Sequence, residues 1–212
     1  MSCGPIKPKE EYLREAYALE DKQDYKNAIK ILNDAVDDYP DYKPSLLSRG
    51  ADKAALGDYK GAIADYSKVI KLDPKNTLAL YNTGNNYKRL NKYLIAIGFY
   101  NKAFKSKGGE SFYFDRTPNR FNLQDNFDVP AHEIFYERGL AYYNVDSAKK
   151  AYNDLKQSIK NNYKADECYY YIGFLYLEIQ KKETACKCFQ QSAQLGYADA
   201  EKALKKYCDT LN

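Results

Sequence analysis

The sequence predicts an all-α protein, an α-solenoid of about five helix–turn–helix repeats that ends in a C-terminal capping helix. One observation behind this prediction is a unit of two short amphipathic helices at residues 43–76, whose pattern recurs before and after it. Another is a small residue at one fixed place in the first helix of each copy, followed by an alanine at one fixed place in the second. Self-similarity at a constant period is the signature of repeat proteins.

The central unit shows how the residues specify each element. Its first helix is expected over about residues 44–56 and begins on a proline, which the first helical turn tolerates. The Gly57-Asp58 pair ends that helix and makes a turn. The second helix carries an apolar stripe at spacings of three and four, formed by Ala62, Ile63, Tyr66, Val69 and Ile70. Asp73 and Pro74 end it, because a residue before proline disfavours the helical conformation.

Gly50 and Ala62 are expected on the faces where these two helices touch. Small side chains at such a contact let helix axes approach to roughly 8–10 Å. A larger side chain at Gly50 is therefore expected to overpack the contact.

The register divides the chain into segments. They are a flexible tail at 1–8, three repeats across 9–110 (9–42, 43–76 and 77–110), an insertion at 111–131, two repeats across 132–199 (132–165 and 166–199), and a capping helix at 200–212. A stack of repeats leaves its last apolar face bare, so a half-polar helix is expected at the end.

Gly50, Ala62, Tyr66, Val69 and Pro74 stand at positions 8, 20, 24, 27 and 32 of a 34-residue unit. This pattern resembles the tetratricopeptide repeat. The unit departs from the family at positions 4, 7 and 11, where it has Leu46, Arg49 and Lys53 in place of tryptophan, leucine and an aromatic or leucine. Residues 192–200 also resemble Sel1-like repeats, which are relatives of the tetratricopeptide repeat.

The resemblance implies a right-handed superhelix and a non-enzymatic scaffold for protein–protein interactions. In relatives the first helix of each repeat forms a concave groove that binds extended peptides or partner helices. Carried over position by position, the groove here consists of Tyr17, Leu47, Tyr81, Asn82, Asn85, Arg89, Tyr136, Leu140, Tyr143, Tyr170 and Phe174.

Asn82 and Asn85 are the most informative members of this set. An asparagine amide both donates and accepts hydrogen bonds, so it can hold a ligand backbone whatever its side chains. Asparagine is also a poor residue for a helix interior, so propensity does not account for either one. The groove tyrosines would supply contact area at low entropic cost, or would instead form the core between repeats.

Relatives that bind chaperone C-terminal tails use lysine, asparagine and arginine at fixed positions of consecutive first helices. Here Leu13 and Tyr17 occupy those places in repeat one, Leu47 and Ala51 in repeat two, and Tyr81 replaces the lysine of repeat three. No chaperone-tail carboxylate clamp is therefore expected.

Composition offers little support for catalysis or nucleic-acid binding. The chain has 33 basic and 29 acidic residues, a balance typical of a solvated helical surface. His132 is the only histidine and has no recognisable catalytic partner. Cys186 and Cys188 would point to nearly opposite sides of a helix, so no metal site is expected, and no cofactor. An enzyme site within the insertion, with Asp115, Arg116, Asp125 and Asp128, is a remaining alternative.

Five cysteines without a disulfide-framework spacing favour a reducing compartment, hence a cytoplasmic protein. No apolar run suggests a signal peptide or membrane insertion. The alternative is a periplasmic lipoprotein scaffold of an envelope assembly. In that case Cys3, within Ser2-Cys3-Gly4, would be the lipid-anchor site of a chain trimmed at its N-terminus.

Residues 111–131 fit no repeat and lack helical periodicity. They are rich in aromatic residues, namely Phe112, Tyr113, Phe114, Phe121 and Phe127. Long irregular loops are uncommon and often functional. Two interpretations remain open, a packed excursion that covers neighbouring helices or a flap over the groove.

Overall fold

The structure is a computed structural model that describes residues 6–106, 113–114, 121–122 and 129–208. The chain forms two compact units that meet in sequence at Val129 and Pro130. The first unit contains α1 (Lys9–Glu20), α2 (Tyr25–Asp38), α3 (Lys43–Ala55), α4 (Tyr59–Leu72), α5 (Thr77–Arg89), α6 (Tyr93–Lys105), β1 (Tyr113–Phe114) and β2 (Phe121–Asn122). The second contains α7 (Ala131–Tyr143), α8 (Ala148–Lys160), α9 (Ala165–Glu178), α10 (Lys182–Gln194) and α11 (Ala198–Tyr207).

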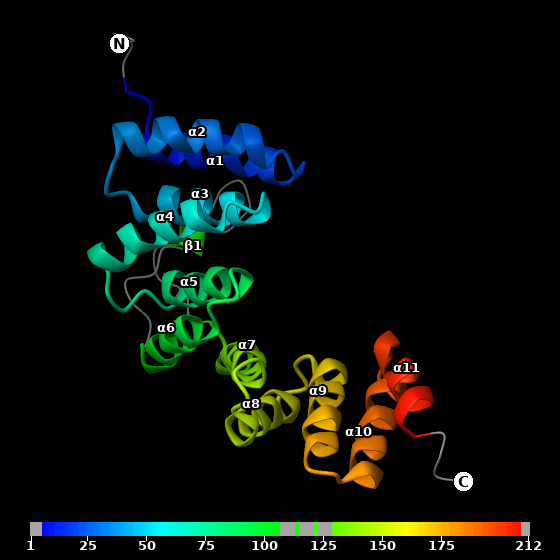
Figure 1. Ribbon diagram of the computed structural model, residues 1–212. Helices are drawn as coiled ribbons and strands as arrows, with labels where there is room; N and C mark the ends of the chain where they lie inside the picture. Colours follow the sequence, from blue (N-terminus) through cyan, green and yellow to red (C-terminus); the bar gives the residue numbers. More distant parts are fainter. Residues whose placement is uncertain (1–5, 107–112, 115–120, 123–128, 209–212) are drawn as a thin grey trace. The chain divides into compact units, whose positions relative to one another are not determined.

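Consecutive helices pack in pairs, and each pair packs on the next within its unit (Figure 1). The prediction of an all-α solenoid is confirmed. Helix α3 begins and ends within one residue of its predicted bounds, and α4 ends directly before Asp73 and Pro74 as expected. Among the described residues the sole strands are β1 and β2, which pair antiparallel with Phe114 opposite Phe121. The two interpretations of the insertion rest mostly on residues outside those described, as does the Cys3 hypothesis.

The two helices of every repeat are joined by the same backbone device. The fifteenth residue of each repeat has a positive φ, between 54° and 83°, and these residues are Gln23, Gly57, Asn91, Asp146 and Gln180. The left-handed conformation reverses the chain at each helix end and favours glycine. Only Gly57 was recognisable from sequence as such a turn, because the other four repeats place a residue with a side chain there.

Small residues allow the first helix of a repeat to approach a bulky side chain of the second. An ideal Cβ placed on Gly50 would lie 2.8 Å from Cε1 of Tyr66, and one on Gly84 would lie 2.7 Å from Cε1 of Tyr100. Both tyrosines are almost fully buried. The contact expected at Gly50 therefore exists, and its direct partner is the ring of Tyr66.

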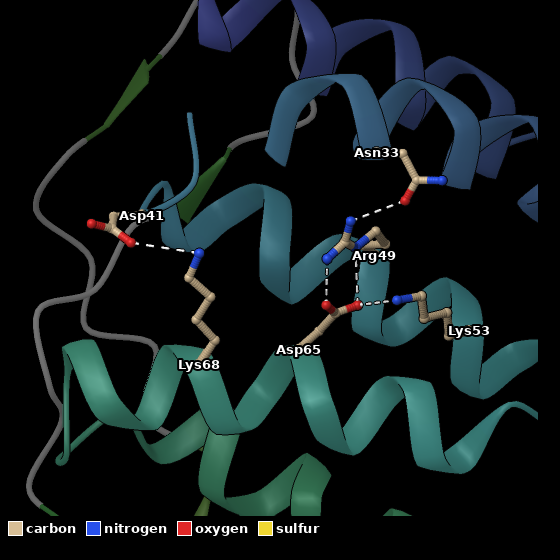
Figure 2. Close-up of polar contacts among 6 residues, drawn as sticks. All are labelled: Asn33, Asp41, Arg49, Lys53, Asp65 and Lys68. Carbon is tan, nitrogen blue, oxygen red and sulfur yellow. Dashed lines mark hydrogen bonds and ion pairs between the residues drawn. The ribbon is translucent and has the colours of Figure 1, made fainter. Parts of the chain in front are cut away.

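An ion pair explains why arginine replaces the leucine that the family has at position 7. Arg49 on α3 donates from Nε and Nη2 to the carboxylate of Asp65 on α4, at 3.0 and 2.6 Å (Figure 2). Lys53 Nζ donates to the same carboxylate at 2.8 Å. Arg49 Nη1 also donates to Asn33 Oδ1 of α2 at 2.9 Å, so the cluster ties repeat one to repeat two.

The same ion pair recurs in repeat four. Arg138 and Asp154 hold positions equivalent to Arg49 and Asp65, and their two hydrogen bonds measure 2.7 and 2.9 Å. The side chains of all four residues are largely buried. Paired charges of this kind hold one helix against its neighbour in a fixed register.

The second unit contains a disulfide bond that was not predicted from the sequence. Cys186 on α10 is joined to Cys208 at the end of α11, a separation of 22 residues in sequence. The packing of α11 on α10 brings the two cysteines together, which their spacing alone does not indicate. Cys188 packs instead against the core around α8 and α9. The expectation that Cys186 and Cys188 point in different directions is therefore confirmed.

The capping helix α11 has the amphipathic character that was expected. Ala200 and Ala203 are buried, and Leu204 and Tyr207 pack with the fully buried Phe189 of α10. The opposite face is exposed and consists of Glu201, Lys202, Lys205 and Lys206.

Asp52 on α3 is a buried carboxyl, 2 % exposed, whose Oδ2 atom has no hydrogen-bond partner among the described residues. Burial, with a further contribution from the negative charge of Glu20, raises the pKa of Asp52 from 3.8 to about 7. The native state therefore binds more protons than the unfolded chain between these two values. The contribution of Asp52 to the free energy of unfolding therefore falls as the pH rises through that range.

The Asp52→Asn variant is expected to lose this pH dependence, because asparagine does not ionise. Above the folded pKa of about 7, it should be more stable than the wild type by on the order of 1–2 kcal/mol. Urea unfolding in mildly acidic and mildly alkaline buffer measures the difference. Asp58→Asn is the matched control, because Asp58 is an exposed helix cap and asparagine caps equally well. An unchanged pH profile for Asp52→Asn would contradict this account.

Candidate functional site

A pocket of about 490 Å³ opens between α3, α4 and α5 of the first unit. Its lining combines small apolar side chains of α3 with polar side chains of α5, namely Ala51, Ala54, Ala55, Tyr59, Tyr66, Asn82, Asn85, Asn86 and Arg89. Alanines on α3 leave the space that larger side chains would fill. The pocket therefore arises where the first helices of repeats two and three face each other.

Asn82 and Asn85, the two asparagines predicted to line the groove, each lie beside a tyrosine hydroxyl. The hydroxyl of Tyr100 donates to Oδ1 of Asn85 at 2.8 Å, so Asn85 retains its amide N–H groups for a ligand. The side chain of Asn82 lies beside the hydroxyl of Tyr66 and lowers the pKa of that hydroxyl. Burial raises the pKa of Tyr66, and this contact opposes the rise only in part. The pocket thus presents two side-chain amides one helical turn apart, and that of Asn85 offers its N–H groups.

Charge in the pocket is one-sided. Arg89 lies exposed at the end of α5, and among the described residues no acidic side chain contributes to the lining. Asn86 is buried and donates from Nδ2 to the backbone oxygen of Asn82 at 2.7 Å, which holds that part of the wall in place. Together these groups suit a polar ligand with hydrogen-bonding groups on its backbone and a negative charge near Arg89.

Three of the groove residues predicted from sequence, Asn82, Asn85 and Arg89, meet in this pocket. Two others from the first unit lie beside the core, with Tyr17 packed on the cluster of repeat one and Leu47 on the cluster of repeat two. Tyr81 is itself buried, and its ring centroid lies 6.1 Å from that of Tyr100.

The predicted groove residues of the second unit belong to its aromatic packing. Tyr136 and Leu140 are buried in the core of α7, α8 and α9. Burial is also the main reason that the pKa of Tyr136 is raised, and its hydrogen bond to Glu167 adds to the effect. The others make edge contacts between rings. Tyr143 packs on Tyr171 at 5.1 Å, and Tyr170 on Phe174 at 4.9 Å.

Sequence reasoning missed several residues that complete the pocket. Ala54, Ala55 and Tyr59 lie at or near the turn between α3 and α4, where helix periodicity gives no direction for a side chain. Tyr66 was recognised as a core residue, yet it also reaches the pocket. A scan for small residues along α3 beside polar residues along α5 could have located this site.

Other kinds of site receive no support from the described part of the chain. No group of three or more histidine, cysteine, aspartate or glutamate side chains is arranged there to hold a metal ion. His132 packs beside Tyr163, with the ring centroids 4.9 Å apart. Among the helices of the described residues, none has the length and apolarity needed to cross a bilayer.

The paired helices, the constant turn and the pocket between first helices define a helical-repeat protein of the interaction-scaffold class. Comparison with family models identifies the family. A model described as "TPR repeat" matches residues 50–91, and one described as "Tetratricopeptide repeat" matches residues 12–42 and 167–200. The chain is a tetratricopeptide-repeat protein, a family whose members act as scaffolds for protein interactions. No curated protein matches the chain in sequence.

Several solved structures share the fold. MamA (residues 41 to the end) from Desulfovibrio magneticus RS-1 is 18 % identical with a TM-score of 0.72, covering 90 % of this chain and 96 % of its own. YrrB, described as a TPR protein with an unusual peptide-binding site, is 15 % identical with a TM-score of 0.69, covering 92 % and 90 %. A tetratricopeptide repeat protein from Parabacteroides merdae is 20 % identical with a TM-score of 0.69, covering 93 % and 74 %. At these identities the likeness concerns the fold alone.

Proposed function

We propose that this protein binds an extended peptide or a helical segment of a partner protein in the pocket between α3 and α5. The observation that carries the proposal is a pair of amides one helical turn apart in the pocket lining, Asn82 and Asn85, of which Asn85 offers its N–H groups. A peptide unit has one N–H and one C=O group, so it can satisfy both asparagines whatever its side chains. A solved structure of the same fold is described as having a peptide-binding site, which adds support by analogy.

The position of Arg89 adds a preference to this proposal. Its guanidinium group can pair with a carboxylate in a bidentate geometry, and no acidic residue of the lining competes for it. The preferred segment is therefore one with an aspartate or glutamate close to the residue held by Asn82 and Asn85. This contact would use one arginine, whereas the chaperone-tail clamp uses lysine, asparagine and arginine together. The absence of such a clamp remains a prediction.

The test uses a variant that fills the pocket without removing any internal hydrogen bond. Ala51 is an exposed lining residue, so Ala51→Arg should obstruct the pocket and lower affinity for a captured partner at least about tenfold. Ala64→Arg is the matched control, because Ala64 is an exposed alanine on α4 that does not line the pocket. Arg89→Ala should weaken binding most for acidic segments.

The partner would be captured from lysate of the source cell with the wild-type protein and identified by mass spectrometry. Its binding segment would then be made as a peptide and titrated calorimetrically against each variant. Equal affinity of the wild type, Ala51→Arg and Ala64→Arg would remove the pocket from the interaction. Unchanged circular dichroism and melting of the variants would exclude a folding defect.

One observation favours the alternative compartment, that of a periplasmic scaffold of an envelope assembly. Disulfides persist in oxidising compartments and are rare in the cytoplasm, and Cys186 is paired with Cys208. We therefore infer an oxidising location, against the cytoplasmic expectation from cysteine spacing. The native protein in lysate of the source cell supplies a test, if thiols are alkylated before any reductant is added. Alkylation of Cys186 and Cys208 in that lysate would return the protein to a reducing compartment.

A further inference from the structure

The surface charge of residues 42–106, which include α3 to α6, is strongly unbalanced, although that of the chain as a whole is not. Residues 42–106 contain four acidic residues, and three of them, Asp52, Asp65 and Asp73, are buried. Only Asp58 is exposed. The same segment exposes seven basic residues, namely Lys60, Lys71, Lys75, Arg89, Lys92, Lys102 and Lys105. Its surface is therefore a concentrated region of positive charge.

Two aliphatic side chains project from α6 within this region. Leu94 is 74 % exposed and Ile95 is 45 % exposed. The other repeats show that this is unusual, because their equivalent pairs are polar or small, namely Lys26-Asn27, Lys60-Gly61, Lys149-Lys150 and Glu183-Thr184. An outer helix face of a repeat protein has no structural need for exposed leucine and isoleucine.

The aliphatic pair and the lysines share one face of α6. Leu94, Lys102 and Lys105 follow the spacing that places residues on one side of a helix, and Ile95 is one step around it. The buried side of α6 is formed by Ala96, Tyr100 and Ala103, which face the rest of the first unit. Helices α5 and α6 contain no acidic residue. Among the described residues, the exposed side of α6 therefore combines apolar and positive groups, with no acidic side chain on α5 or α6.

We propose that this outer face of α6, formed by Leu94, Ile95, Lys102 and Lys105, docks on the surface of an anionic lipid bilayer. Leucine and isoleucine would enter the headgroup–acyl boundary, and the lysine ammonium groups would pair with lipid phosphates. None of these residues lines the pocket between α3 and α5, so the pocket would remain available to a partner. The docking is peripheral, since two aliphatic side chains do not amount to a spanning segment.

A bilayer fits this face better than the other polyanionic partners. Peptides bind best in grooves, whereas these side chains project from the outer side of a helix. A nucleic acid would pair with the lysines but would gain little from the exposed leucine and isoleucine. A lipid surface uses both kinds of group together.

Vesicle flotation with the full chain tests the proposal. The wild type should float with mixed phosphatidylcholine–phosphatidylglycerol vesicles, not with pure phosphatidylcholine vesicles, and binding should weaken as salt is added. Lys102→Gln together with Lys105→Gln should lower the partition coefficient by on the order of tenfold or more. The matched control is Lys26→Gln with Lys30→Gln, which removes two exposed lysines from α2 and should change binding little.

A second variant separates the apolar contribution from the charge. Leu94→Lys with Ile95→Asn installs the Lys26-Asn27 pair of repeat one on α6 and adds a positive charge. If the aliphatic side chains enter the bilayer, this variant binds mixed vesicles more weakly than the wild type, on the order of tenfold. Equal or tighter binding would contradict docking by an apolar face.

Two further outcomes would overturn the proposal. One is a wild-type protein that does not float with mixed vesicles. The other is a wild-type protein that does not float with vesicles but binds a DNA duplex or an acidic peptide and shifts its migration, with that binding lost in the Lys102→Gln/Lys105→Gln variant. That result would assign the same surface to a different polyanion. All substituted residues are exposed, so melting curves serve to verify that each variant is folded.

Discussion

Replacing Asp65 with alanine is expected to lower the free energy of unfolding by about 3–5 kcal/mol. The carboxylate neutralises two cations at once, with Arg49 Nη2 at 2.6 Å and Lys53 Nζ at 2.8 Å. Its side chain is only 6 % exposed, and that of Arg49 is 14 % exposed. Alanine would leave the guanidinium group largely desolvated and without its carboxylate, and this desolvation accounts for most of the expected loss.

The matched variant replaces both partners, Arg49→Leu together with Asp65→Leu. Leucine is the residue that the family has at position 7, so this change restores an apolar contact where the chain has an ion pair. Replacing a buried pair with apolar groups is often neutral or stabilising, so the double variant should recover most of the loss. Lys53 is the most exposed member of the cluster and can turn toward water. Urea unfolding of the two variants beside the wild type gives the comparison.

If Asp65→Ala cost less than about 1 kcal/mol, the cluster would behave as a surface ion pair, and burial would not be the source of its strength. The equivalent pair in repeat four offers an independent repetition of the experiment. Arg138 and Asp154 are similarly buried, so Asp154→Ala should cost a comparable amount. Agreement between the two units would show that the effect belongs to the position in the repeat.

Helix bounds and small-residue contacts could be predicted from the sequence because both depend on local pattern. Proline, glycine and aspartate mark the ends of α3 and α4, and the period of the repeat places Gly50 against the second helix. The ion pair could not be predicted in the same way. Arg49 and Asp65 are 16 residues apart on different helices, and a charged residue at a usually apolar position looked like a simple departure from the family.

The candidate site was predicted only in part, for a related reason. Position within a repeat indicates which helix a residue belongs to, and the structure places Asn82, Asn85 and Arg89 in the lining of one pocket. It does not indicate how deeply a long side chain is buried. Tyr136 and Leu140 therefore appeared as groove residues, although they are 6 % and 8 % exposed. The disulfide depends on packing between α10 and α11, which the cysteine spacing alone does not indicate.

Gly84→Ala and Gly98→Ala are expected to change stability in opposite directions, although both add one methyl group to a helix of repeat three. A Cβ on Gly84 would lie 2.7 Å from the ring of Tyr100, which is fully buried and cannot move aside. A Cβ on Gly98 would have no atom within 4 Å. Overpacking should lower the free energy of unfolding by about 2 kcal/mol for Gly84→Ala. Gly98→Ala should raise it by about 0.5–1 kcal/mol through helix propensity.

Repeat one indicates how the protein accommodates an alanine at this position. There Ala16 stands where repeat three has Gly84, and Leu32 stands where it has Tyr100, with both side chains fully buried. Combining Gly84→Ala with Tyr100→Leu reproduces that arrangement. Tyr100→Leu alone should be destabilising, because it removes a buried ring and the hydrogen bond to Asn85.

Because the smaller leucine leaves room for the alanine methyl group, the double variant should lose clearly less stability than the sum of the two single losses. Chemical denaturation of the four proteins in this cycle measures the coupling between the two positions. Additive losses would mean that the helices separate to relieve the clash. A favourable coupling would mean that the sizes of the side chains at positions 8 and 24 of a repeat jointly set the distance between its two helices.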